Sequence, residues 1–188
     1  GAGSNGTSSL VFSTSGSNYL FAWDTATDLP NTEDSTVYVR LQSSDTLTSS
    51  NLAASSVFAI DTLDPIISNL SITQSPGSDN VNIIYDLADN SGSNNTIQLL
   101  ISSNGGSSWN VATTTLSGDV NYAVTAGSSR TISWDAGTDF GNQENNTMRM
   151  KLRATDRYDN VGSYVESANF SVDTKAPAVS SVSASQTA

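Results

Sequence analysis

The sequence predicts an all-β fold, organised as tandem two-sheet sandwich domains. Three observations lead to this prediction. Apolar and polar residues alternate along several short segments, Asn, Gly, Ser and Asp separate these segments, and one part of the chain repeats another. No window of about 11 residues carries the 3.6-residue apolar stripe of an amphipathic helix, so no helix is expected.

The clearest strand is expected at residues 147–156. Met148, Met150 and Leu152 fall on one face of this segment, and basic residues occupy the alternate positions. Further strands are expected at residues 65–74, 80–89, 96–102, 129–134 and 167–174. About seven strands in roughly 110 residues is typical of a two-sheet sandwich.

The tandem organisation follows from an internal repeat. Residues 16–45 and 127–156, at a shift of 111, are identical at 11 of 30 positions. After a one-residue insertion, residues 58–74 match residues 170–186 at a shift of 112. The segments "IDTLDP" (60–65) and "VDTKAP" (172–177) are therefore equivalent linkers between repeats. Their proline ends one strand and stiffens the entry to the next, because it fixes φ and lacks an N–H.

Only one repeat is complete in this sequence. We expect a complete sandwich at 65–176, the later half of a sandwich at 1–64, and at 177–188 either the first strand of a following repeat or a donated strand. Three explanations remain open for the half repeat: the position at which the sequence was cut, coverage of only part of a longer chain, or completion by another subunit. The last predicts that residues 177–186 pair as a strand with the N-terminal domain of a different chain.

Composition excludes several classes of function. The net charge is −11 with only 7 Lys and Arg residues, which disfavours nucleic acid and anionic membranes as partners. Cysteine and histidine are absent, so a Ser-His-Asp triad, a Cys nucleophile and a Cys/His zinc site are excluded. No apolar run reaches the ~18 residues of a membrane helix. The acidic residues stand among Asn, Gly and Thr, which is typical of solvated loops, so an enzyme is not expected.

The acidic loops are candidate calcium sites, because calcium takes six to eight oxygen ligands in flexible geometry. Asp and Asn also populate turns by bonding their own backbone, and this second interpretation stays open. The candidates in the linkers and beside them are Asp61, Asp64, Asp156, Asp159 and Asp173. The candidates in the loops that follow two equivalent tryptophan strands are Asp24, Asp28, Glu33, Asp135, Asp139 and Glu144.

Two of the three tryptophans are expected to be structural rather than to stack on sugars. Trp23 and Trp134 are equivalent in the repeat and lie within strand patterns, which predicts core packing. Trp109 ends the segment "SSNGGSSW" (102–109), which resembles the Asp-box turn of sialidase-type propellers. One such turn without repeated blades does not make a propeller. A hairpin with a tight turn at Asn104-Gly105 is predicted instead.

The segment "LRATDRYDNVGSYVESANFSVDTKAP" (152–177) resembles the closing strands and linker of bacterial Ig-like or fibronectin-type-III-like repeats. The matching positions are Asp156, Asn160, Phe170, Asp173, Thr174 and Pro177. The sequence departs from the family pattern at Asp159, where glycine is common.

This resemblance implies an extracellular or cell-surface structural module, which serves as a spacer or stalk in an adhesin, or as a building block of a filament or surface layer. Its partners would be adjacent repeats of the same or a neighbouring chain. The alternative is a carbohydrate- or ligand-binding module of a secreted multimodular protein. An exposed aromatic platform would favour this alternative, whereas buried tryptophans and a polar surface would favour the structural module.

Overall fold

The computed structural model describes residues 6–11, 13, 15–90, 92 and 94–186. The chain divides into two compact units, Gly1–Leu63 and Asp64–Ala188, called unit 1 and unit 2 below. The strands pair antiparallel in both units, so the fold is all-β with a minor helical part.

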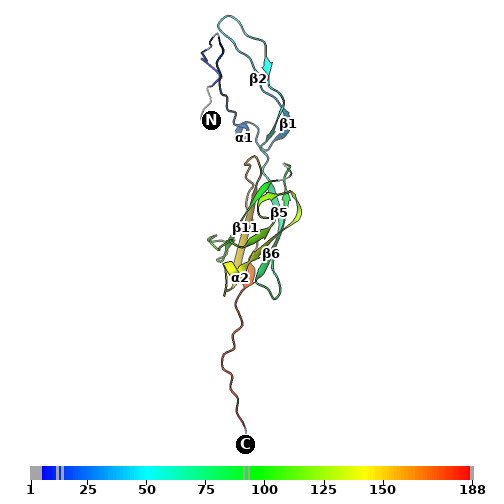
Figure 1. Ribbon diagram of the computed structural model, residues 1–188, viewed down its shortest axis with the longest axis vertical. Coiled ribbons are helices and arrows are strands. Elements are labelled where there is room, and N and C mark those ends of the chain that lie inside the picture. The colour runs from blue at the N-terminus through cyan, green and yellow to red at the C-terminus, as the bar shows by residue number, and fades with distance from the viewer. Residues whose placement is uncertain (1–5, 12, 14, 91, 93, 187–188) are drawn as a thin grey trace. The chain divides into compact units, whose positions relative to one another are not determined.

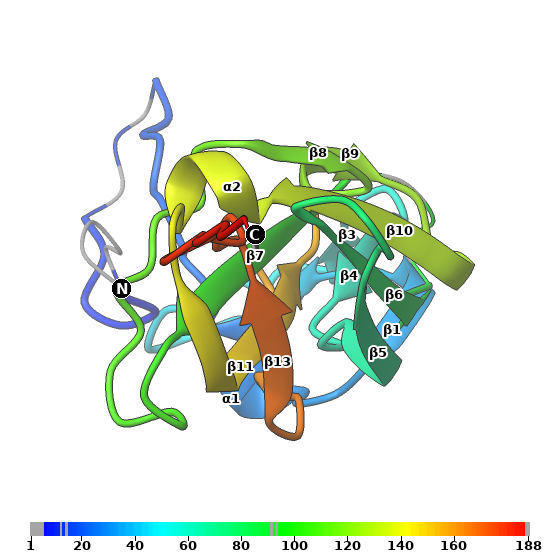
Figure 2. The same cartoon turned by 90° about the horizontal axis from the view of Figure 1, so that it is seen from below.

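Unit 2 contains two antiparallel sheets (Figures 1 and 2). The first sheet has the strand order β5-β6-β10-β8, and the second has the order β12-β11-β7-β9, with β13 pairing with β11. The strands of the first sheet are β5 (Ile66–Gln74), β6 (Asn80–Ala88), β10 (Gly127–Asp135) and β8 (Leu116–Gly118). Those of the second are β12 (Val165–Glu166), β11 (Glu144–Thr155), β7 (Asn95–Ser102), β9 (Asn121–Val124) and β13 (Phe170–Asp173).

One hydrophobic core joins the two sheets of unit 2. The alternation predicted for β11 is confirmed, because Met148, Met150 and Leu152 are 0% exposed and the basic residues between them lie on the outer face. The core position of Trp134 is also confirmed, since it is 0% exposed. Other members of this core come from β6, β7 and β10: Val81, Ile83, Tyr85, Leu87, Ile97, Leu99, Ile101 and Ile132.

The described residues of unit 1 form two short β-ribbons. β1 (Glu33–Val37) pairs with β4 (Phe58–Asp61), and β2 (Arg40–Leu41) pairs with β3 (Ala53–Ala54). Trp23 is only half-buried, so the prediction that it packs in a core like Trp134 is wrong for this unit. The physical reason is that the described part of unit 1 contains no counterpart of β6 and β7, the strands that supply much of the core around Trp134.

The strand registers of the two units correspond. In unit 1, Glu33, Asp34 and Val37 lie opposite Asp61, Ile60 and Phe58, with an irregularity between Asp34 and Val37. In unit 2, at shifts of 111 and 112, the paired residues are Glu144 with Asp173, Asn145 with Val172, and Met148 with Phe170, and the irregularity stands at the same place. The matching sequences of 33–37 and 144–148 therefore form the same local pairing.

The expectation of no helix is wrong at two places. α1 (Thr25–Asp28) and α2 (Ala136–Asp139) are single helical turns in the acidic loops. The carboxylates of Asp24 and Asp135 cap them by accepting hydrogen bonds from Thr27 N–H and Thr138 N–H, at 3.2 and 3.1 Å. One turn is too short to carry an apolar stripe, and for this reason the sequence pattern did not indicate it.

Candidate functional site

Asp139 is the most connected acidic residue of the loop that follows β10. Its carboxylate accepts hydrogen bonds from Trp134 Nε1–H at 2.9 Å and from the N–H and hydroxyl of Thr115 at 3.2 and 2.9 Å. The hydroxyl of Thr114 donates to it as well. Burial alone would raise the pKa of Asp139, but these hydrogen bonds outweigh burial and hold its pKa below the usual value. This carboxylate ties the loop before β8 to α2.

The equivalent acidic residues of unit 1 have similar local roles. Asp28 accepts a hydrogen bond from Trp23 Nε1–H at 2.7 Å, as Asp139 does from Trp134. Glu33 and Glu144 are the first residues of β1 and β11. In both units, therefore, the first aspartate of the loop caps the helical turn and the second accepts a hydrogen bond from the indole N–H. The glutamate is the first residue of the strand that follows.

The linker aspartates bond to the backbone two residues further on. Asp61 Oδ1 accepts from Leu63 N–H at 3.0 Å, and Asp173 Oδ1 accepts from Lys175 N–H at 2.9 Å. Asp64 is exposed. The turn interpretation of these aspartates is thus consistent with their observed contacts.

The threonine of each linker makes a matching set of contacts. In unit 2, Thr174 Oγ1 donates to the Phe140 carbonyl at 2.8 Å and accepts from Gln143 N–H at 3.0 Å. In unit 1, Thr62 Oγ1 donates to the Leu29 carbonyl and accepts from Thr32 N–H at 3.0 Å. Each linker threonine thereby ties the end of its strand to the loop after the one-turn helix.

Asp156 organises the turn after β11. It is 4% exposed, and its carboxylate accepts from Tyr158 N–H at 2.8 Å, Asn160 N–H at 2.9 Å and Asn160 Nδ2–H at 2.8 Å. Asp159 lies in the same turn with φ at +68°, a left-handed conformation that glycine adopts without cost. The departure from glycine at this position is accommodated because Asp tolerates that conformation better than most residues.

Calcium remains a prediction. In the described part of the chain, no three acidic side chains form a group that could hold a metal ion. The carboxylates of Asp61, Asp139, Asp156 and Asp173 already accept hydrogen bonds from neighbouring groups. A bound calcium would have to replace such hydrogen bonds or combine with them.

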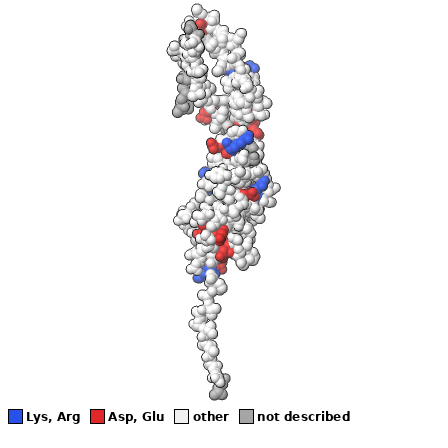
Figure 3. All heavy atoms as spheres, in the orientation of Figure 1, with Lys and Arg blue, Asp and Glu red and all other residues white. Residues whose placement is uncertain are grey.

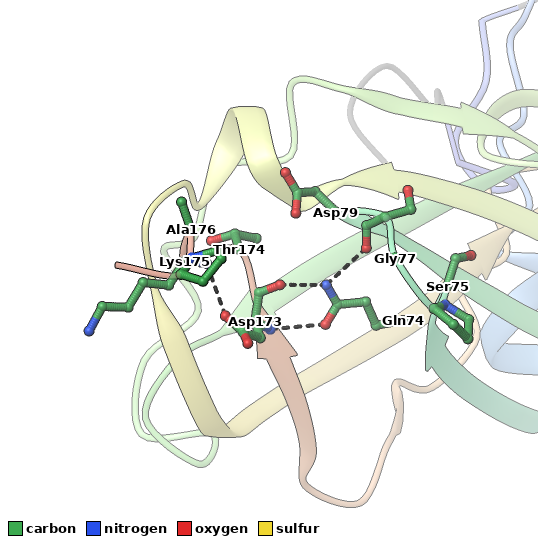
Figure 4. A pocket seen from close by; sticks show the side chains of 11 residues that line it. Gln74, Ser75, Gly77, Asp79, Asp173, Thr174, Lys175 and Ala176 are labelled. Atoms are coloured by element: carbon green, nitrogen blue, oxygen red, sulfur yellow. Dashed lines mark hydrogen bonds between the residues drawn. The ribbon is translucent and has the colours of Figure 1, made fainter. Parts of the chain in front are cut away.

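A hollow lies at the C-terminal end of unit 2 (Figure 4). It has a volume of about 510 Å³ and is lined by residues 74–79 and 173–177. Gln74 connects the two sides, since its Nε2–H donates to the Asp173 carbonyl at 2.7 Å and its Oε1 accepts from Asp173 N–H at 2.9 Å. The lining mixes polar and apolar groups, and it includes the "VDTKAP" linker from Asp173 onward.

A stack of cations and aromatic rings covers part of the outer face of the second sheet. Lys151 Nζ lies 4.4 Å from the centre of the Trp109 ring and 4.5 Å from that of Tyr164. The guanidinium of Arg153 lies 4.7 Å from the centre of the Tyr164 ring. Arg149, two residues before Lys151, pairs with Glu166 at 3.2 Å. The alternation of basic residues was visible in the sequence, but their stacking depends on distant Trp109 and Tyr164 and was missed.

The "SSNGGSSW" segment forms a turn that returns the chain to β7. Ser102 Oγ accepts from Gly106 N–H and Asn104 Oδ1 accepts from Ser108 N–H, each at 2.9 Å. Val111 then bridges to Ile101, which gives the antiparallel return expected of a hairpin. Positive φ angles occur at Gly105 and Gly106 and not at Asn104, so the predicted two-residue turn at Asn104-Gly105 is wrong.

Comparisons with protein-family models, curated proteins and solved structures gave no match to this chain. None of the helices in the described residues has the length and apolar character needed to cross a membrane.

Proposed function

We propose that this chain belongs to a tandem array of Ig-like or fibronectin-type-III-like β-sandwich repeats, and that its role is structural. It would serve at the cell surface as a spacer, a stalk, or a building block of a filament or surface layer. The observation that carries this proposal is the pair of equivalent linkers. Thr62 and Thr174 make the same hydrogen bonds at a shift of 112 residues, next to the same strand register.

The surface and core of unit 2 support the structural role. Charged residues are sparse, and most of the face shown in Figure 3 carries uncharged side chains. Trp134 is fully buried, and the carboxylates described above stabilise turns. A structural module of this kind acts by adding length to the array and by contacting the adjacent repeats, because each repeat in such an array contacts only its neighbours.

The partner in this proposal is an adjacent repeat, of the same chain or of another. Residues 177–186 match β5, and no strand is assigned to them within the described chain. Strand formation by this segment would require a following repeat or a neighbouring subunit. Calcium would act, where it binds, by neutralising the linker carboxylates and fixing the angle between repeats.

The test is small-angle X-ray scattering on chains that carry one, two and three copies of residues 65–176 in tandem. Stiff linkers predict that the maximum dimension grows in nearly equal steps with each copy. Replacing the linker prolines by glycine is the matched control and should make the growth less than linear. Compact particles that do not lengthen with copy number would contradict the spacer role.

A further inference from the structure

The outer face of β11 concentrates positive charge in an acidic chain. Arg149, Lys151 and Arg153 occupy alternate positions of one strand, whereas the whole chain has only 7 Lys and Arg against 18 Asp and Glu. Alternate residues of a strand lie about 6.6 Å apart, so the three cations form a regular row. Arg149 is paired with Glu166, but neither Lys151 nor Arg153 forms an ion pair with any residue that the structure describes.

Aromatic rings hold this row in place. The Lys151 ammonium lies over the rings of both Trp109 and Tyr164, and the Arg153 guanidinium lies over the ring of Tyr164. Exposed Gln98 fixes the end of the row, because its Oε1 accepts from Arg153 Nε–H at 2.8 Å and from the Tyr164 hydroxyl at 2.6 Å. The stack thus positions two cationic groups before any ligand arrives, which lowers the entropy cost of binding.

We propose that this face binds an acidic polysaccharide through its uronate carboxylates. The carboxylates would pair with Lys151 and Arg153, and the sugar rings would lie beside the half-buried Trp109 and Tyr164, whose rings keep the two cations in place. Among the described residues, no acceptor is bonded to the Gln98 Nε2–H groups, so both donors are available for sugar hydroxyl groups. This binding activity is independent of the proposed structural role, since it depends on one face of unit 2 and not on the array.

The net charge of −11 does not forbid such a ligand. Charges at the surface are screened over about 8 Å at physiological ionic strength, so carboxylates elsewhere on the chain act weakly at this face. Within the described residues, Glu166 pairs with Arg149 and neutralises it, and no described acidic group pairs with Lys151 or Arg153. A long polyanion would meet more of the acidic surface, and a short oligomer is therefore the better probe.

The experiment is calorimetric titration of the full chain with tetragalacturonate, with its methyl ester as the uncharged control ligand. We expect saturable binding of the acid and at least about tenfold weaker binding of the ester, the loss expected for one charge-assisted hydrogen bond. Lys151→Gln and Arg153→Gln should each weaken binding of the acid by about tenfold. Binding should also change the tryptophan fluorescence, and Trp109→Phe should abolish that change.

Arg157→Gln is the matched control variant. It removes the same charge and a similar stacked pair, since Arg157 lies 4.6 Å from the centre of the exposed Tyr158 ring, but outside the row. The affinity of this variant for the acid should stay within roughly twofold of that of the unchanged chain, because Arg157 is an exposed charge outside the row and its effect on the ligand is screened by water and salt. If Lys151→Gln fails to fold, Arg153→Gln at the end of the row carries the test. Absence of binding, equal binding of the ester, or equal weakening by Arg157→Gln would overturn the proposal.

Discussion

The indole Nε1–H of Trp134 donates to Asp139 Oδ2 at 2.9 Å, and the donor is completely buried. The same pair occurs between Trp23 and Asp28 at 2.7 Å, although Trp23 is half-buried. In both units the carboxylate belongs to the last residue of a one-turn helix that begins two residues after the tryptophan, although only Trp134 lies in a strand. The contact satisfies a polar atom that the core would otherwise leave without a partner.

Asp139→Ala should therefore destabilise unit 2. The substitution leaves the Trp134 N–H buried without an acceptor, which costs about 1–3 kcal/mol of the free energy of unfolding. Denaturant unfolding, followed by tryptophan fluorescence in a Trp23→Phe background, measures this loss. Asp28→Ala is the matched control and is measured in a chain that keeps Trp23. It should lower the free energy of unfolding by less, because water can reach the half-buried Trp23. Equal losses for the two substitutions would show that burial of the indole does not decide the cost.

The same carboxylate predicts a pH dependence. The pKa of Asp139 is held below its reference value of 3.8, because the hydrogen bonds from Thr114, Thr115 and Trp134 outweigh the opposing effect of burial. Its stabilising contribution is therefore complete above about pH 3.8 and is lost as the pH falls through the lower, folded-state pKa. Unfolding measured from pH 5 to pH 2 should show a shallower decline for Asp139→Asn than for the unchanged chain. A parallel decline in both proteins would exclude this carboxylate as a source of the acid sensitivity.

Regular alternation made β11 and the core position of Trp134 predictable. The pattern of Met148, Met150 and Leu152 needs only the period of a strand, which the sequence displays directly. The short strands β8, β9 and β12 and the one-turn helices were not predicted, because two to four residues carry no measurable period. The stack around Lys151 could not be found for a different reason: it depends on whether Trp109, from the turn after β7, and Tyr164, just before β12, reach β11.

Substitutions in the turn of Asp156 can distinguish a structural role of its carboxylates from calcium binding. Asp156→Ala removes the acceptor of three hydrogen bonds at a nearly buried site, so it should lower the free energy of unfolding by about 2 kcal/mol or more even in EGTA. If calcium also binds at this turn, millimolar calcium should raise the melting temperature of the unchanged chain. Asp159→Gly would remove a carboxylate without backbone strain. This variant should therefore melt at the same temperature as the unchanged chain in EGTA, but calcium should no longer raise its melting temperature. A melting temperature that is the same in EGTA and calcium would refute calcium binding.

Gly162 lies where the turn after β11 comes close to the backbone of Pro65, the residue before β5. A Cβ atom at this position would stand 2.1 Å from the carbonyl oxygen of Pro65, and backbone on both sides leaves little room for adjustment. Gly162→Ala should therefore cost about 2–3 kcal/mol, as expected when an added methyl group forces backbone to move. Gly77→Ala is the matched control: its φ is +70° and nothing lies within 4 Å, so only the left-handed conformation is penalised, by about 1 kcal/mol.

Because Pro65 ends the "IDTLDP" linker, displacement of its carbonyl would move the point where the linker enters unit 2. A Gly162→Ala chain as stable as Gly77→Ala would show that the linker entry yields easily, which would argue against a stiff junction between repeats.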